Sequence, residues 1–331
     1  MSGKVLPIVE CAECHRPPSD WSSSSSSRCH RALRDALFGN VFQSISFFVV
    51  AALAFGASTA CFSGLALLRQ PKDFGRLATS PALFAALNVL TAVAWLSFFF
   101  GLKWLEPAVV ATLYNGIGPL TVLVLGGLGW MEAKARPSIG EWLCYLGLAG
   151  VLAALVVVVL TDRSGFTVSS SITQAGALLA VGVGGVTITI SHLIARWFND
   201  RGVGSDAITG TRFLLTLCVS VGVEAAIGRT TTRPPLAAVP LLMLTAFAVV
   251  TIPSFMLQLG IARASPLAVN IMRSLGPVSV FAVQQLDGRL RFSGATLLCV
   301  AGFCIFAIAA SVLRAWSEVK AGSNDPTLER A

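Results

Sequence analysis

Two stretches of this chain carry the same pattern: residues 101–147 read GLKWLEPAVVATLYNGIGPLTVLVLGGLGWMEAKARPSIGEWLCYLG, and residues 260–302 read GIARASPLAVNIMRSLGPVSVFAVQQLDGRLRFSGATLLCVAG. Each stretch has a glycine, a proline, a Gly-Pro pair, an acidic residue, two basic residues and two further glycines, in that order. The Gly-Pro pairs are Gly118-Pro119 and Gly276-Pro277. So many matches in one order indicate an internal duplication, and the duplication decides the fold.

The composition is that of a membrane protein. The 331 residues are 55% hydrophobic and 12% charged, whereas a soluble domain has about 25% charged residues. Apolar runs that can cross about 30 Å of hydrocarbon recur along the chain, and a backbone exposed to lipid must be helical to satisfy its hydrogen bonds. They predict nine transmembrane helices, at residues 41–68, 82–103, 107–130, 139–161, 173–197, 207–227, 238–262, 266–286 and 293–315.

The two similar stretches fall on equivalent helices of this series. The first covers the second, third and fourth predicted spans, and the second covers the seventh, eighth and ninth. Equivalent helices are thus five spans apart, and an odd offset reverses the direction in which a helix crosses the bilayer. We therefore expect two inverted repeats, which is the usual architecture of secondary transporters with a substrate site near the midplane.

The residues from Leu102 to Ala108, the Gly118-Pro119 pair and Glu132 resemble the drug/metabolite transporter superfamily, and within it the EamA-like transporters. The second copy repeats the signature from Gly260 to Ala262 and again at three later positions, Pro277, Asp287 and Gly302. The resemblance covers roughly residues 41–315. It implies an all-α polytopic fold of ten helices, in two inverted repeats of five, that moves small metabolites across a membrane.

This chain departs from the family pattern at its N-terminus, where the first helix is missing or altered, so the sequence predicts nine to ten spans. We expect four segments: a disordered polar tail at 1–40, a first repeat of four spans at 41–161, a second repeat of five spans at 173–315, and a polar C-terminal tail at 316–331. The first tail lacks the apolar core and cleavage site of a signal peptide.

The basic residues predict an orientation. Connections on the same side as residues 69–80 hold eleven Lys and Arg, and those on the other side hold six. Positive charge favours the cytoplasm, so the first side is expected to be inside a plasma or inner cell membrane. With nine spans, the five bases of the 1–40 tail fall on the opposite side and remove this bias. The span count and the side of the N-terminus therefore stay open.

The N-terminal tail contains the motif Cys11-Ala12-Glu13-Cys14-His15. This is the spacing of haem attachment, and together with Cys29 and His30 it also suits a zinc site. Three fixed positions in a Cys-containing tail are easily met by chance, and a short disordered segment offers no fold to hold haem. Chance is the favoured interpretation, and no cofactor or metal is expected.

Arg273 is the strongest candidate site residue, because it lies inside the 266–286 span, four residues before Pro277. A guanidinium keeps its charge in the membrane and needs an anion nearby, which a substrate carboxylate or phosphate would supply. A structural salt bridge or a side chain that reaches the interface is the alternative.

Further substrate-binding candidates follow from the repeat and from helical spacing. Asn115 is the repeat equivalent of Arg273, with Tyr114 beside it, and Asn270 lies one turn before Arg273 on the same helix face. Trp95 aligns near Ser254, just after Pro253, where a kink could shape a cavity, although core packing is the stronger interpretation. Gln258 is expected to face the pathway or to bridge helices.

Two other polar residues in the spans are interpreted as interfacial. His192 has the pKa for a proton relay but lies near the end of its predicted span. Arg212 matches an Arg-Phe pair found at the start of that helix in the resembled family, and we interpret it as an interface anchor. Glu224 is too far from Arg212 along one helix for the two to pair.

Together these patterns predict a secondary transporter for a small polar or amphipathic metabolite, of amino-acid-like or drug-like kind, that works by alternating access. The sequence has no ATP-binding loop, and its spans hold too few acidic residues and histidines for an enzyme. The net charge of +8 is spread over loops, which fits contact with lipid headgroups and not with nucleic acid. Proton coupling, exchange, homodimerisation, substrate and direction stay open. The alternative is a membrane bundle that does not transport and instead scaffolds or regulates another membrane protein.

Overall fold

The computed structural model describes residues 46–129, 138–166, 170–227, 239–246, 255, 257–258, 266–285 and 290–323. These residues belong to one unit of the chain, 42–331. The predicted N-terminal tail at 1–40 and the motif at Cys11, Cys14 and His15 lie outside the described residues. Of the predicted C-terminal tail at 316–331, residues 316–323 are described, and they are helical. Within the described part, no group of His, Cys, Asp or Glu has the arrangement of a metal site.

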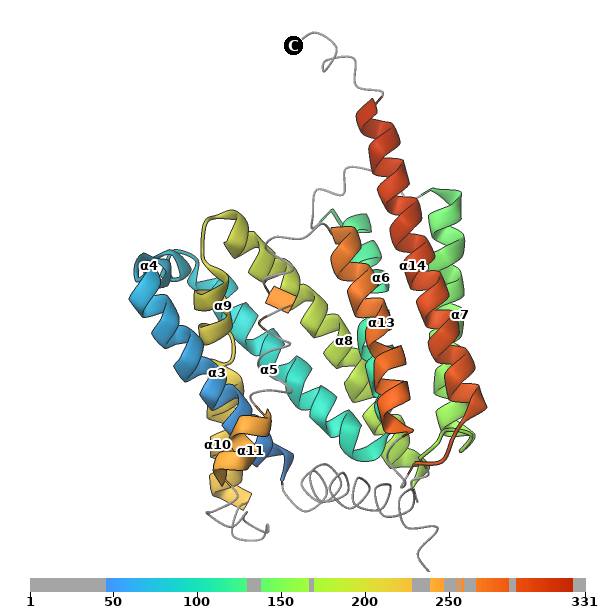
Figure 1. Ribbon diagram of the computed structural model, residues 1–331, viewed down its shortest axis with the longest axis horizontal. Helices are drawn as coiled ribbons and strands as arrows, with labels where there is room; N and C mark the ends of the chain where they lie inside the picture. Colours follow the sequence, from blue (N-terminus) through green and yellow to red (C-terminus); the bar gives the residue numbers. More distant parts are fainter. Residues whose placement is uncertain are drawn as a thin grey trace, which may run out of the picture. The chain divides into compact units, whose positions relative to one another are not determined.

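The described residues fold entirely into helices and their connections (Figure 1). The helices are α3 (Phe47–Arg69), α4 (Lys72–Ala78), α5 (Pro81–Trp104), α6 (Pro107–Gly127), α7 (Ile139–Leu160), α8 (Ser171–Asp200), α9 (Ser205–Thr211), α10 (Leu214–Ile227), α11 (Val239–Ala246), α13 (Pro266–Gln284) and α14 (Gly294–Ser323). Among the described residues, seven stretches are long and apolar enough to cross a membrane: α3, α5, α6, α7, α8, α9 joined to α10, and α14. The chain is therefore a multi-pass membrane protein, as its composition predicts.

Helix starts follow from local sequence. Pro81 and Pro107 open α5 and α6, where proline has no hydrogen bond to lose. Ser138 opens α7 with a capping box, in which its hydroxyl accepts from the Glu141 N–H and the Glu141 carboxylate accepts from the Ser138 N–H. The predicted spans at 82–103, 107–130 and 139–161 are confirmed by these helices to within a few residues.

Some predicted spans differ in detail from the structure. The expected span at 173–197 is the longer helix α8, which continues to Asp200, and the expected span at 293–315 is the longer helix α14, which continues to Ser323. The expected span at 207–227 is broken between α9 and α10. The Leu215 N–H donates to the side-chain oxygen of Asn88 at 3.3 Å, and a side chain that enters the helix ladder in this way commonly bends a helix.

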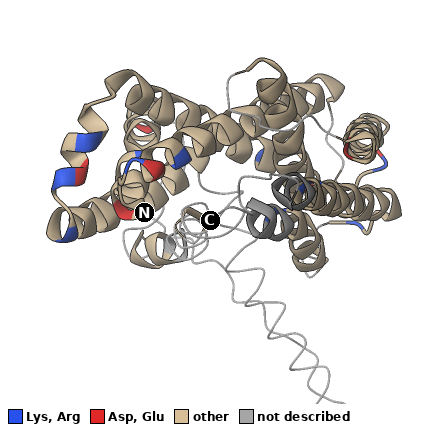
Figure 2. Cartoon of the chain, turned by 90° about the horizontal axis from the view of Figure 1, so that it is seen from above, with Lys and Arg blue, Asp and Glu red and all other residues tan. Residues whose placement is uncertain are grey.

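The helices pack in defined neighbourhoods. α5 lies along α8, α7 lies along α14, and α3 packs on α9 and α10 (Figure 1). α6 contacts both α8 and α13. The charged residues occupy few short stretches of the ribbon, and most of the described helical length carries none (Figure 2).

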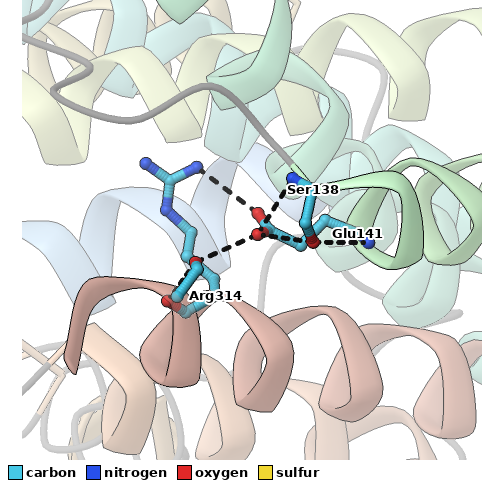
Figure 3. Close-up of polar contacts among 4 residues, drawn as sticks. Ser138, Glu141 and Arg314 are labelled. Atoms are coloured by element: carbon cyan, nitrogen blue, oxygen red, sulfur yellow. Dashed lines mark hydrogen bonds and ion pairs between the residues drawn. The ribbon is translucent and has the colours of Figure 1, made fainter. Parts of the chain in front are cut away.

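Three buried carboxylates join connections that are distant in sequence. Asp73 accepts hydrogen bonds from the Gly204 N–H at 2.7 Å and from Arg76 at 3.1 Å, which ties α4 to the turn before α9. Glu141 lies beside Ser317 and Arg314 of α14, with its oxygen atoms 3.1 Å from the serine hydroxyl and 4.0 Å from the guanidinium (Figure 3). Each carboxylate is 1% exposed, so each depends on these donors.

The third carboxylate, Glu106, has three neutral donors. It accepts from the Gly165 N–H at 2.7 Å, from the Thr296 hydroxyl at 3.0 Å and from the Gln284 side-chain amide. Gln284 in turn accepts from the Ala108 N–H at 3.0 Å. This network joins the start of α6 to the α7–α8 connection, the end of α13 and the start of α14.

Candidate functional site

Arg212 is a buried guanidinium at the break between α9 and α10. It is 4% exposed, and it donates to the Ser191 hydroxyl of α8 at 2.7 Å and to the Gln258 side-chain oxygen at 3.2 Å. Burying a charge is costly unless it is hydrogen-bonded, so these two acceptors keep the charge in place. Both acceptors are neutral, and among the described residues the Nε atom of Arg212 has no hydrogen-bond partner.

The Arg212 contacts extend to neighbouring helices. Ser191 also accepts from the Thr91 hydroxyl of α5 at 3.4 Å. The guanidinium carbon lies 5.4 Å from the centre of the Phe213 ring, close enough for a weak cation–π attraction. α5, α8 and the α9–α10 break are thus held together around this one cation.

Arg273 extends from α13 toward α6. A Cβ atom built on Gly118 would lie 3.8 Å from a terminal nitrogen of Arg273 and 3.1 Å from the Thr189 hydroxyl of α8. The guanidinium end therefore lies beside the glycine of the Gly118-Pro119 pair, where a side chain on α6 would crowd it. Arg273 is partly exposed, and in the described part of the chain its side chain has no hydrogen bond or ion pair.

The charges of both Arg212 and Arg273 act on Tyr114 and on His192. In the described part of the chain, the buried Tyr114 hydroxyl and the buried His192 Nδ1 atom have no hydrogen-bond partner. The Tyr114 ring packs on Phe98, with 4.9 Å between the ring centres.

The position of Tyr114 follows from a close helix crossing. A Cβ atom on Gly185 of α8 would lie 2.9 Å from the Tyr114 backbone oxygen of α6, closer than side-chain carbons are found. Small residues allow membrane helices to approach in this way. The crossing brings Tyr114 against α8, on which Thr189, Ser191 and His192 follow within two turns.

We call this group of residues the polar centre. Its members come from α6, α8, the α9–α10 break, the short helical segment at 257–258 and α13: Tyr114, Gly118, Thr189, Ser191, His192, Arg212, Gln258 and Arg273. It carries two positive charges. Five described acidic residues bond to groups outside the polar centre. Asp73, Glu106 and Glu141 have the partners given above, Asp206 pairs with Arg69, and Asp162 accepts from Gln174.

The polar centre contains buried polar atoms without a partner. Among the described residues, eleven buried side-chain nitrogen and oxygen atoms have no hydrogen-bond partner, and four of them belong to Tyr114, His192, Arg212 and Gln258. Folded proteins pair the great majority of such atoms, with protein groups or with water. Four in one place have the chemistry of a site that takes up water or a polar ligand.

The structure brings three of the six predicted substrate-binding residues together, namely Tyr114, Gln258 and Arg273. Asn115 donates to the Ala111 carbonyl of its own helix at 2.8 Å instead. Trp95 lies in an aromatic cluster, 5.2 Å from Phe55 between ring centres. Asn270 is in α13, but its side chain lies outside the described part of the structure.

One interpretation from sequence is wrong. Arg212 is no interface anchor, because it is buried and bonded to Ser191 and Gln258. His192 lies eight residues before the end of α8 at Asp200, and its interfacial position stays a prediction. The sequence carried one signal for Arg212, a base placed inside an apolar run, but its contacts with Ser191 and Gln258 are distant in sequence.

A separate groove of about 600 Å³ lies between α6, α7 and α8. Ile117, Val156 and Leu178 are among its lining residues, and the lining is almost wholly apolar. Such a lining offers no hydrogen bonds to a polar molecule but suits lipid acyl chains. We therefore place the candidate site at the polar centre and not in this groove.

Comparison with known proteins gives the fold and no more. No family model matches the sequence, and no curated protein matches it. One solved crystal structure, described only as that of a protein, is similar with a TM-score of 0.58 and 18% sequence identity, over 87% of this chain and 97% of that chain. At this identity the likeness supports a shared arrangement of helices and says nothing about activity.

Proposed function

We propose that this protein is a secondary transporter for a small polar or amphipathic metabolite, with its substrate site at the polar centre. The observation that carries the proposal is a pair of arginines, the buried Arg212 and the partly exposed Arg273, that lie beside unpaired polar atoms among apolar helices. Charged groups at membrane depth are costly and generally mark a pathway or a ligand.

The helix contacts favour two inverted repeats of the EamA-like kind as the frame of this site. In the expected repeat, α6 is equivalent to α13, α7 to α14, and α3 to the pair α9 and α10. Each helix packs against its equivalent. Two repeats related by a two-fold axis bring their equivalent helices into contact where they lie next to that axis, so these pairings agree with the duplication in the sequence.

In this proposal the polar centre lies where the repeats meet. Tyr114 and Gly118 belong to the first repeat, whereas Ser191, Arg212 and Arg273 belong to the second. A cargo bound there would contact both repeats, so a rocking movement of one against the other would open the site to each side in turn. Energy from proton coupling or from exchange is compatible with this arrangement.

Counterflow in proteoliposomes tests the proposal. Purified protein is reconstituted with a high internal concentration of unlabelled amino acids, organic acids or amines, and uptake of the labelled solute is followed. We expect saturable uptake of at least one solute class, above that of protein-free vesicles. Folded protein that exchanges none of them would refute transport and favour a bundle that scaffolds another membrane protein.

A further inference from the structure

The two arginines of the polar centre form an excess of positive charge that the described part of the chain does not neutralise. Arg212 has only the neutral acceptors Ser191 and Gln258. Arg273 has none within the described residues, and the Gly118 position leaves space beside its terminal nitrogen. The charges of both arginines act on Tyr114 and on His192, so an anion that enters the polar centre would be attracted by both guanidinium groups.

We propose that the cargo carries a carboxylate or phosphate group and that this group binds between Arg212 and Arg273. This inference rests on the proposed transport function and narrows it from polar metabolites in general to organic anions. The group would take the place of solvent at the two guanidinium groups and complete their hydrogen bonding.

The geometry of the donors fits such a group. A guanidinium presents several N–H donors in a plane and binds carboxylate and phosphate through paired hydrogen bonds. Within the described residues, the Nε–H of Arg212 has no acceptor, and the Tyr114 hydroxyl is a further donor without a partner. Donors from α6 and from the α9–α10 break would then meet on one anion, which links cargo binding to the relative position of the two repeats.

An anionic lipid headgroup carries the same chemistry as a small organic phosphate. The two sources differ in what they need. A small anion must reach the polar centre through water, whereas a lipid must place its headgroup there while its chains stay in the apolar phase. The test therefore includes both.

Thermal unfolding of the detergent-purified protein is measured with succinate, sn-glycerol 3-phosphate or inorganic phosphate, and with the matched neutral molecules succinamide and glycerol. A further arm adds phosphatidylglycerol alone. We expect at least one small anion to raise the unfolding temperature, its neutral counterpart to have no effect, and the shift to vanish in Arg212→Gln and Arg273→Gln. In Arg69→Gln, which removes an exposed arginine whose side chain is 66% accessible, the shift should remain.

A glutamine variant could also lose the shift because it is misfolded. Arg273→Lys controls for this, because it keeps the positive charge. It should retain part of the anion-dependent shift while losing paired hydrogen bonds. Equal shifts in wild type and both glutamine variants would overturn the proposal, because the anions would then bind at the surface. If phosphatidylglycerol raises the unfolding temperature and no small anion does, the proposal is overturned in favour of a lipid site.

Counterflow of the same solutes separates this inference from the transport function. Saturable exchange of succinamide, glycerol or amines without any exchange of anions would refute the anionic cargo and leave transport intact. An anion-dependent shift without exchange of any solute would support the anion site and refute transport. We expect exchange of the stabilising anion, reduced at least tenfold by Arg273→Gln.

Discussion

The Arg212 guanidinium donates to the Ser191 hydroxyl at 2.7 Å, and this contact joins the break between α9 and α10 to α8. The arginine is 4% exposed and the serine is fully buried. The bond therefore helps to hold a charged group inside the protein. Its loss should lower the free energy of unfolding and change the position of Arg212 in the polar centre.

Ser191→Ala should lower the free energy of unfolding by about 1–3 kcal/mol, because a buried charged donor would lose its better acceptor. The matched control is Ser311→Ala, since the Ser311 hydroxyl only donates to the Ala307 carbonyl of its own helix. Denaturant unfolding in detergent measures both. An equal, small effect of the two substitutions would show that the Arg212–Ser191 bond contributes nothing to stability.

Gly118→Val should abolish transport while the protein stays folded. A Cβ atom there would lie 3.1 Å from the Thr189 hydroxyl and 3.8 Å from Arg273, so two further methyl groups would fill the space beside the guanidinium. Gly127→Val on the same helix is the control, because nothing lies within 4 Å of its Cβ position. Counterflow rates are compared, with size-exclusion profiles as a check of folding. Full transport by Gly118→Val would mean that cargo does not pass beside Gly118.

Glu106→Gln should destabilise the junction of α6, α13 and α14. The carboxylate accepts from three neutral donors, and an amide would turn one of these bonds into a contact between two donors. We expect a loss of about 1–3 kcal/mol in unfolding free energy. Asp200→Asn, at the exposed end of α8, should change stability by less than about 0.5 kcal/mol. If the two variants are equally stable, Glu106 does not stabilise this junction.

The helix-capping group at the start of α7 allows a finer test (Figure 3). Ser138→Ala should cost about 1 kcal/mol, because the Glu141 N–H would lose its cap. Arg314→Gln should cost less, because its 4.0 Å contact with Glu141 is long and the arginine side chain is 34% exposed. Thermal unfolding of both variants shows which substitution destabilises the protein more. A larger effect at Arg314 would show that the ion pair, and not the cap, fixes this end of the helix.

Much of the fold follows from local signals in the sequence. The predicted spans that open at a proline, α5 and α6, begin within one residue of the structure, because Pro81 and Pro107 define the first turn. The capping sequence at Ser138 and Glu141 fixes α7 in the same way. Composition alone is sufficient to identify helices that cross a membrane.

The candidate site was less predictable, because it depends on contacts between helices far apart in the chain. Repeat symmetry paired Arg273 with Asn115, yet the structure sets the arginine beside Gly118, one turn further along α6. Asn115 turns to its own backbone. Arg212 was missed, since its inward position depends on Ser191 and on Gln258, and no local pattern shows these contacts.

The most direct test of the account is counterflow of the best-exchanged labelled solute by wild type and Arg273→Gln, reconstituted in equal, folded amounts. A transporter with its site at the polar centre predicts saturable wild-type exchange and at least a tenfold loss in the variant. Saturable exchange that the substitution leaves unchanged would contradict the assigned site. Wild-type protein that exchanges no solute would contradict transport itself.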